Sequence, residues 1–130
     1  MENKDCVFCK IVNKKIPAEV IYEDDKCLVI PDKFPATKGQ SLVITKKHED
    51  YIMNLDSKVY QHIFNVARKI SLAIDKAFDT ERTCIVVEGF EVPHVHIRLH
   101  PAYEKRLLTS GFEEGIIELK KVVNKIKENL

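Results

Sequence analysis

Three histidines fall within seven residues in the segment Pro93–Pro101, whose sequence is PHVHIRLHP. Side chains alternate between the two faces of a strand, so an extended segment here places His94, His96, Arg98 and His100 on one face. The apolar residues between them then point to the other face, into a core. A row of imidazoles and a guanidinium on a strand that is buried on its other side favours an anionic or metallic ligand over a bare solvated surface.

The histidine row is compatible with two kinds of chemistry, and its spacing leaves both open. Histidines at alternate positions can hold a metal ion, and His94, His96 and His100 could surround a catalytic metal. Alternatively, one neutral imidazole can attack phosphorus while its cationic neighbours hold the phosphate oxygens.

A second group of reactive side chains lies near the start of the chain. Cys6 and Cys9 form a C-x-x-C pair, and four cysteines in 130 residues are too few for a disulfide-built mini-protein. In a reducing compartment this spacing suggests metal ligands or a redox pair before it suggests a structural disulfide.

Hydrophobic periodicity predicts the elements that must position these residues. Apolar steps of three and four residues predict a short helix at 6–15, a long helix at 56–78 and a C-terminal helix within 110–130 that Ser110 caps. Short β-rich runs predict strands at 20–23, 27–30, 41–45, 82–87 and 95–99. Strands joined by tight turns pair antiparallel, and the long helices must cover a sheet face, so the predicted class is α+β.

Composition limits the class of protein. The chain has 21 Lys and Arg against 20 Asp and Glu, which argues against a broad basic surface for nucleic acid. Its apolar runs are too short to span a bilayer, and the first residues lack the character of a targeting peptide. We therefore expect a soluble, cytoplasmic, single-domain protein that does not bind nucleic acid or a membrane.

The chain resembles the histidine triad (HIT) superfamily of nucleotide hydrolases and transferases. The strand at 94–99 matches its pattern of three histidines separated by apolar residues, with Arg98 at the third position. Other motifs of the family's N-terminal half match in order, and they are Phe8-x-Lys10-Ile11, Ile16-Pro17-Ala18, Tyr22-Glu23-Asp24, Asp32, Gly39, Leu42-Val43-Ile44 and Lys47-His48. The resemblance covers about residues 5–101 and is closest to the Hint-like and bacterial Hit proteins.

This resemblance implies a single HIT domain over residues 1–130, with a core at about 5–101 and a helical extension at about 110–130. The implied fold is an antiparallel five-stranded sheet with a long central helix, a short N-terminal helix and an extra C-terminal helix. Family members are homodimers. The central helix also carries apolar residues on more than one flank (Ile63, Val66, Ile70 and Ile74), more than one sheet face needs, whereas His62 falls on its polar side.

The family's site residues carry over to particular positions. His96 corresponds to the nucleophile that attacks the α-phosphorus of a nucleotide, and His94 to the residue that orients it. Asp32 corresponds to the carboxylate that accepts hydrogen bonds from the ribose hydroxyls. Three residues match the lining of the base pocket, although core packing explains their apolar character equally well: Val7, Phe8 and Ile11. The implied ligand is a purine nucleotide or nucleotide conjugate.

The bacterial branch also implies a structural zinc ion. Its ligands correspond here to Cys6, Cys9, His48 and His94, and two thiolates with two imidazoles make a closed tetrahedral site.

Three departures from the family pattern bear on substrate choice. The third triad position is Arg98, the preceding loop at 88–93 is short and lacks the family's leaving-group contacts, and the C-terminal extension differs. An arginine stays charged and cannot donate a proton at neutral pH, so we expect anhydrides or phosphoesters to be preferred over phosphoramidates. The expected protein is a HIT-type nucleotide hydrolase or nucleotidyltransferase acting through a covalent nucleotidyl-histidine. The alternative is a zinc-stabilised nucleotide-binding protein with little or no turnover.

Overall fold

The structure is a computed structural model of the chain that describes residues 3–106, 108 and 111–130. Its elements, in chain order, are α1 (Val7–Val12), β1 (Tyr22–Glu23), β2 (Cys27–Pro31), β3 (Ser41–Thr45), the 3₁₀ helix η1 (Ile52–Asn54), α2 (Ser57–Phe78), β4 (Arg82–Val86), β5 (His96–Ala102) and α3 (Ile116–Lys127). The predicted cap residue Ser110 lies outside the described residues, and α3 itself begins at Ile116.

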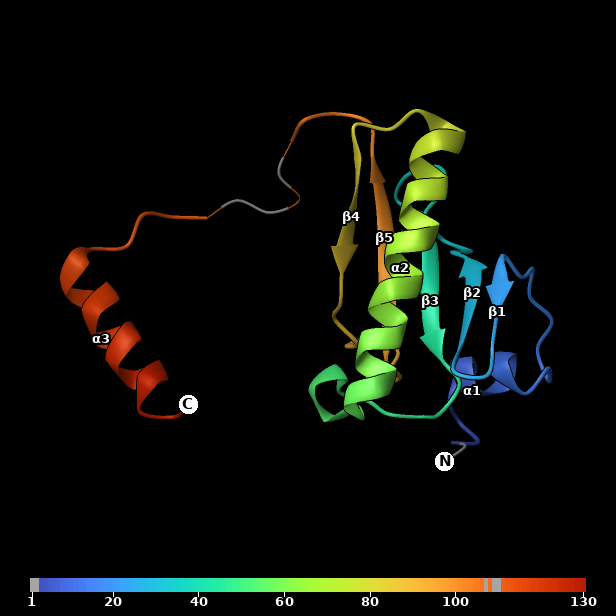
Figure 1. The fold of residues 1–130 in the computed structure, drawn as a ribbon, viewed down its shortest axis with the longest axis horizontal. Coiled ribbons are helices and arrows are strands. Elements are labelled where there is room, and N and C mark those ends of the chain that lie inside the picture. Colours follow the sequence, from blue (N-terminus) through green and yellow to red (C-terminus); the bar gives the residue numbers. More distant parts are fainter. Residues whose placement is uncertain (1–2, 107, 109–110) are drawn as a thin grey trace.

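The five strands form one antiparallel sheet in the order β1-β2-β3-β5-β4 (Figure 1). The predicted α+β class with a five-stranded antiparallel sheet and a long central helix is therefore confirmed. Strand β5 lies between β3 and β4, and its His96 is opposite Ile44 while Arg98 is opposite Leu42 and Val86. The residues of the histidine row thus lie near the middle of the sheet rather than at an edge.

One face of the sheet is covered by α2 (Figure 1). The apolar stripe of this helix packs against alternate residues of the strands, including Val43, Ile97 and Leu99. The residues that suggested a spare flank, Ile63, Val66, Ile70 and Ile74, are all buried in this core. The sequence argument that they exceed the needs of one sheet face is therefore wrong, because a helix of 22 residues crossing a twisted sheet buries a wide stripe.

The opposite face is covered in part by α1. At the N-terminal end of α1, Phe8 and the two cysteines pack against the sheet. They contact Leu28, Ile30 and Ile44, which alternate along the strands with the residues that face α2. Strands β2 and β3 are consequently buried on both faces, and the molecule has three layers. The row formed by His96, Arg98 and His100 lies on the α1 side, where its side chains are partly exposed and the residues between them are buried.

Strand β5 begins one residue later than predicted and runs further, to Ala102. The reason is a tight turn around Pro93, in which the His94 amide donates to the Val92 carbonyl. Both His94 and Val95 are buried as a result, so the alternation of exposed and buried residues begins only at His96.

Helix α1 is shorter than the predicted segment 6–15 and ends at Val12. Its N-cap is Cys6, whose sulfur accepts a hydrogen bond from the Cys9 amide at 3.4 Å. Both cysteines therefore lie at the beginning of this helix, on the side that meets the sheet.

Helix α3 stands apart from the rest of the molecule (Figure 1). None of its residues is buried. Its exposed apolar residues include Ile116, Ile117, Leu119, Val122, Val123 and Ile126.

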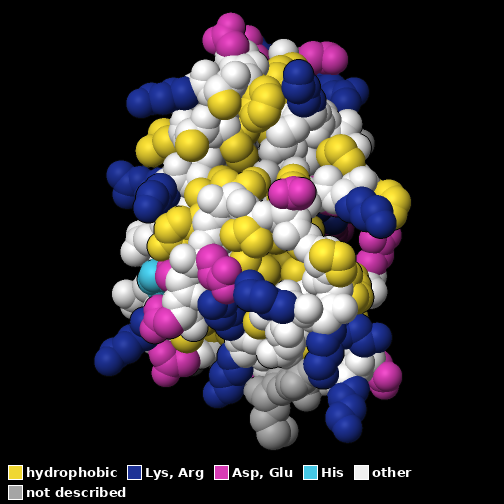
Figure 2. Space-filling model, turned by 90° about the vertical axis from the view of Figure 1, so that its right-hand side faces the viewer, with side chains coloured by type: hydrophobic (Ala, Val, Ile, Leu, Met, Phe, Trp, Pro, Cys, Tyr) yellow, Lys and Arg dark blue, Asp and Glu magenta, His cyan; other side chains and the backbone are white. Residues whose placement is uncertain are grey.

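The side of the molecule that carries β1 and α1 is shown in Figure 2. Hydrophobic side chains gather across its middle, and Lys and Arg side chains alternate with Asp and Glu around them. Among the described residues, no helix combines the length and the apolar character that crossing a bilayer requires.

Candidate functional site

Four predicted metal ligands from three distant parts of the sequence meet at the end of the histidine row. Cys6 Sγ lies 3.3 Å from His94 Nδ1, and Cys9 Sγ lies 3.5 Å from the same nitrogen. His48 Nδ1 is 3.2 Å from Cys9 Sγ and 3.1 Å from His94 Nδ1. The structure therefore brings together all four residues that the resemblance implied.

The surroundings of His94 prepare it to accept a metal. Its Nε2 lies 2.7 Å from the Thr45 carbonyl oxygen, which can only accept, so Nε2 carries the proton and Nδ1 presents a lone pair to the cluster. Burial lowers the pKa of His94 and the nearby His48 and His96 lower it further, while the Thr45 carbonyl opposes this shift. A neutral imidazole with a fixed tautomer is the form that binds metal ions.

The donor set fits a tetrahedral ion. With metal–sulfur bonds of about 2.3 Å and metal–nitrogen bonds of about 2.05 Å, a tetrahedral site separates two nitrogens by about 3.3 Å and a nitrogen from a sulfur by about 3.6 Å. The separations in the cluster, 3.1–3.5 Å, are close to these values. Backbone amides of Asn3 and Cys9 also donate to the two sulfurs, which stabilises thiolates.

His96 is held by a hydrogen bond between one of its ring nitrogens and the backbone. Its Nδ1 lies 2.6 Å from the carbonyl oxygen of His94, so Nδ1 carries a proton and donates it. In the neutral ring the lone pair is then on Nε2, which is the nucleophilic atom. The ring of Phe8 packs edge-on against His96 with centroids 4.8 Å apart, and this contact limits rotation of the imidazole.

Arg98, the next residue of the row, is paired with a residue that the sequence analysis did not single out. Its Nη2 lies 2.9 Å from Oε1 of Glu88, which follows the end of β4. Both side chains are partly exposed. The register of β4 against β5 places Val86 opposite Arg98, so the second residue after Val86 lies on the same side of the sheet.

At the far end of the row, Asp32 and His100 are joined through Gln40. Gln40 Nε2 donates to Asp32 Oδ2 at 2.7 Å, and its Oε1 accepts from the Ala36 amide at 3.3 Å. Since Oε1 is thereby an acceptor, His100 Nδ1, 3.1 Å away, is the donor. The carboxylate implied to bind ribose is thus in one network with the last histidine, and Gln40 is 96% buried, with a relative exposure of 4%.

The apolar residues implied to line a base pocket lie beside the row. Phe8 is buried and contacts the rings of His94 and His96. Ile11 is partly buried and packs against the apolar core between α1 and the sheet. Val7 is exposed at 39%. Phe8 therefore also serves the core, whereas Val7 has surface available to a ligand.

A second group of metal-ligand types surrounds Asp24, near the β1–β2 turn. Its Oδ1 accepts from the amides of Lys26 and Cys27, and its Oδ2 accepts from the Tyr22 hydroxyl and lies 2.6 Å from His62 Nε2. Burial alone would raise the pKa of Asp24, but these hydrogen bonds hold it well below the usual range. Burial raises the pKa of Cys27 to about 12, so its thiol is protonated. Because the Asp24 carboxylate already accepts hydrogen bonds on both oxygens, we interpret this group as a structural contact rather than a metal site. The Asp24–His62 hydrogen bond joins α2 to the turn between β1 and β2.

His62, which the sequence places on the polar side of the long helix, is therefore not a plain surface residue. The polar side of α2 at this point faces the turn before β2, where Asp24 receives it.

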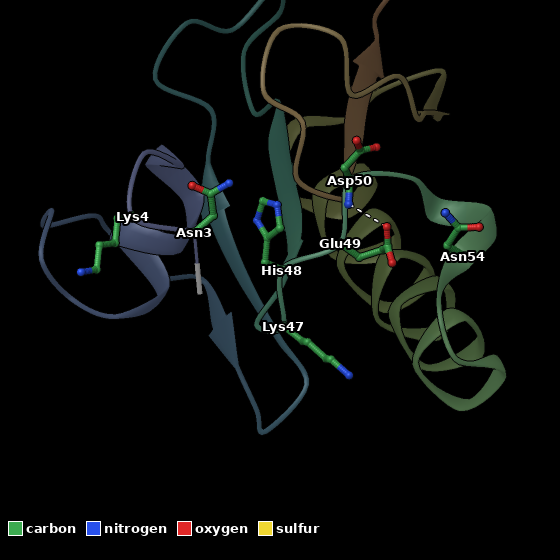
Figure 3. Close-up of a pocket in the computed structure, with 7 residues that line it drawn as sticks. All are labelled: Asn3, Lys4, Lys47, His48, Glu49, Asp50 and Asn54. Carbon is green, nitrogen blue, oxygen red and sulfur yellow. Dashed lines mark hydrogen bonds between the residues drawn. The ribbon is translucent and has the colours of Figure 1, made fainter. Parts of the chain in front are cut away.

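A hollow of about 710 Å³ borders the metal-ligand cluster on its outer side. It is lined by Asn3, Lys4, Lys47, His48, Glu49, Asp50 and Asn54. The side chains of this hollow spread apart and carry both signs of charge, as Figure 3 shows. It touches the cluster through His48 and does not include His96, so we place the candidate active site on the exposed side of the β5 row.

Comparison with known protein families gives a consistent result. A family model described as the HIT domain matches residues 13–105. An uncharacterized HIT-like protein of Borreliella burgdorferi is 35% identical over 131 residues, which cover 95% of this chain and 92% of that protein. A protein named adenylylsulfatase HINT3 of Arabidopsis thaliana is 35% identical over 109 residues, or 80% of this chain and 55% of that protein.

Solved structures of HIT family proteins also superpose on this chain. The crystal structure of a HIT family member from Bacillus subtilis superposes with a TM-score of 0.88 at 26% identity and covers 98% of each chain. A zinc-bound histidine triad family protein from Mycobacterium smegmatis has a TM-score of 0.73 at 25% identity, over 97% of this chain and 98% of its own.

Proposed function

Because the chain belongs to the HIT family, we propose that it is a nucleotide-binding hydrolase or transferase that cleaves the bond between the α-phosphorus of a nucleotide and its leaving group. The observation that carries this proposal is the state of His96. Its Nδ1 is hydrogen-bonded to the His94 carbonyl, so Nε2 is directed away from the backbone, on the partly exposed face that also presents Arg98.

In the proposed first step, the lone pair of His96 Nε2 attacks the α-phosphorus and a phosphorus–nitrogen bond forms. The bond to the leaving group breaks, and that group departs with the electron pair. As the imidazole becomes positively charged, its Nδ1 proton stays bonded to the carbonyl of His94, which stabilises the charge. In the second step water, or another acceptor, attacks phosphorus and releases the nucleotide from His96.

The nucleotide is proposed to lie along β5. Asp32 at the Gln40 end accepts from the ribose hydroxyls, since a carboxylate can accept from two vicinal hydroxyls at once. Phe8, Ile11 and Val7 are proposed to contact the base, which we take to be a purine. Arg98 holds the oxygens of the α-phosphate beside His96.

We propose that the cluster of Cys6, Cys9, His48 and His94 binds one structural zinc ion. Two thiolates and two imidazoles in a closed tetrahedron are typical of structural zinc, and a zinc-bound relative has the same fold. Bound zinc would join α1 to His94, two residues before the start of β5, and so would hold the His94 carbonyl against His96. The ion itself would do no chemistry, because all four positions are filled by the protein.

The leaving group is proposed to depart without a proton from the row. Arg98 cannot donate a proton at neutral pH, and its partner Glu88 is an exposed carboxylate. A leaving amine needs such a proton, and general acid catalysis is worth about a hundredfold to ten-thousandfold. We therefore propose that anhydrides and phosphoesters are better substrates than phosphoramidates.

We also propose that the protein is a cytoplasmic homodimer. The dimer is supported by α3, whose apolar side chains are exposed. The B. subtilis crystal structure superposes with a TM-score of 0.88 over 98% of this chain, and that share extends beyond the end of β5 at Ala102. An apolar helix held away from its own core is stabilised by packing on a second copy. Light scattering of the full chain at micromolar concentration should give twice the mass of 15.0 kDa.

The proposed activity is tested by incubating purified protein with a panel of adenylylated compounds and measuring AMP release. The panel contains adenylyl sulfate, a diadenosine polyphosphate and an adenosine phosphoramidate. AMP release that His96→Ala abolishes supports the proposal. AMP binding without release from any compound would instead favour the second candidate, a zinc-stabilised nucleotide-binding protein without turnover, which the replacement of a histidine by Arg98 favours.

A further inference from the structure

An acidic residue lies beside Arg98, the residue of the row that we propose to hold the α-phosphate. Glu88 accepts from Arg98 at 2.9 Å, between Nη2 and Oε1. The side chains that flank Arg98 across the sheet, on Leu42 and Val86, are apolar. Glu88 is therefore the carboxylate that neutralises the guanidinium within the described part of this face.

A phosphate that binds Arg98 must share the guanidinium with Glu88 or displace it. The ion pair is half exposed, with side-chain exposures of 34% for Arg98 and 48% for Glu88, so it is weak enough to be displaced. A carboxylate close to the phosphate also repels it, and the repulsion grows with the phosphate charge.

Substrate and product differ in that charge. In a nucleotide conjugate the α-phosphate is bonded to a leaving group and carries one negative charge. In the released monophosphate it carries nearly two at pH 7.5, because the second pKa of a phosphate monoester is about 6. Because Glu88 already offsets part of the positive charge of Arg98, the pair is better suited to an α-phosphate with one negative charge than to one with two.

We propose that Glu88 is a specificity-determining residue that competes with phosphate for Arg98 and so favours the monoanionic conjugate over the dianionic product. The inference rests on the proposed function, since it assumes that a nucleotide phosphate binds beside His96. Its consequence is that product leaves readily after each turnover.

The test is isothermal titration calorimetry at pH 7.5 with three ligands that share the nucleoside and differ in charge. They are adenosine, adenosine 5′-methyl phosphate and AMP. The proteins are the full-length wild type, Glu88→Gln and Glu91→Gln. Glu91 is an exposed carboxylate in the same loop, so its variant controls for the loss of one negative charge nearby.

In Glu88→Gln we expect unchanged affinity for adenosine, about threefold tighter binding of the methyl phosphate and about tenfold tighter binding of AMP. Product inhibition by AMP should become stronger to the same degree. Glu91→Gln should change each affinity by less than about twofold.

Two results would overturn the role of Glu88. Equal changes in affinity for all three ligands would show that Glu88 does not discriminate between phosphate charges. Weaker AMP binding in Glu88→Gln would show that Glu88 merely orients Arg98. If the wild type binds none of the three ligands, the proposed nucleotide site itself is wrong, so the two failures are distinct. Thermal melting of both variants checks that they are folded.

Discussion

Replacing both Cys6 and Cys9 with serine removes two of the four donors of the proposed zinc site. The cluster joins positions that are far apart in sequence, since Cys9 and His94 are separated by 85 residues. A cross-link that closes a loop of this length restricts the unfolded chain and stabilises the native state by about 4–5 kcal/mol. For a chain of this size each kcal/mol shifts the melting temperature by about 3–5 °C, so we expect a loss of about 12–25 °C.

The assay combines elemental analysis with thermal unfolding in the presence and absence of a strong chelator. Wild-type protein should contain about one zinc per chain and should be destabilised by the chelator, whereas the double variant should contain none and be insensitive. Cys84→Ser is the matched control, because Cys84 is half-buried on β4 and lies outside the cluster.

Activity per folded molecule separates a structural from a catalytic metal. His96 is held by the backbone carbonyl of His94 rather than by its imidazole, so turnover at a temperature where the variant is folded should fall far less than stability. Wild-type protein that contains no zinc as purified, or whose melting temperature the chelator leaves unchanged, would refute the site. A complete loss of turnover in folded double variant would refute its structural role.

Three further predictions concern single residues. His96→Ala should abolish AMP release while AMP still binds in calorimetry, because Nε2 is the proposed attacking atom; wild-type turnover in this variant would exclude His96 as the nucleophile. Arg98→His should raise kcat/KM for a phosphoramidate at least about tenfold relative to a diadenosine polyphosphate, because an imidazolium can donate the proton that the amine needs; an unchanged ratio would contradict the argument from proton donation. Asp24→Asn should cost about 1–3 kcal/mol of stability near neutral pH, because the carboxylate accepts hydrogen bonds from His62, Tyr22 and two amides. Its native pKa is lowered, so this contribution is present above the unfolded value of about 3.9 and is lost as the pH falls through the native pKa; urea unfolding of variant and wild type should therefore converge in acid, and a difference that grows in acid would contradict it.

The metal-ligand set shows what resemblance to a family can supply before a structure exists. Cys6 and Cys9 attract attention by their own spacing, but nothing local connects them to His48 or His94. Their convergence depends on α1 packing on the sheet face next to the end of β3, which is a tertiary event. The Thr45 carbonyl that fixes the tautomer of His94 gives no sequence pattern at all, because every residue has a carbonyl group.

Local patterns determined the secondary structure and the inner face of each element. The period of 3.6 predicted α2 to within a residue, and the period of 2 predicted that Ile97 and Leu99 are buried while His96 and Arg98 face the other way. These rules work because the geometry of a helix or strand alone decides which of its residues share a side. They did not indicate that His94 is fully buried against Phe8, the residue that also packs on His96, or that His62 on the polar side of α2 meets Asp24.

The partners of the row were decided by the order of strands in the sheet. Glu88 reaches Arg98 because β4 is the neighbour of β5, and Gln40 joins Asp32 to His100 because the start of β3 lies beside the end of β5. Such pairs lie far apart in sequence, and side-chain hydrogen bonds of about 3 Å require a register that a single strand cannot specify. The sequence therefore contained the reactive groups and the face on which they lie, and the sheet topology gave each of them its partner.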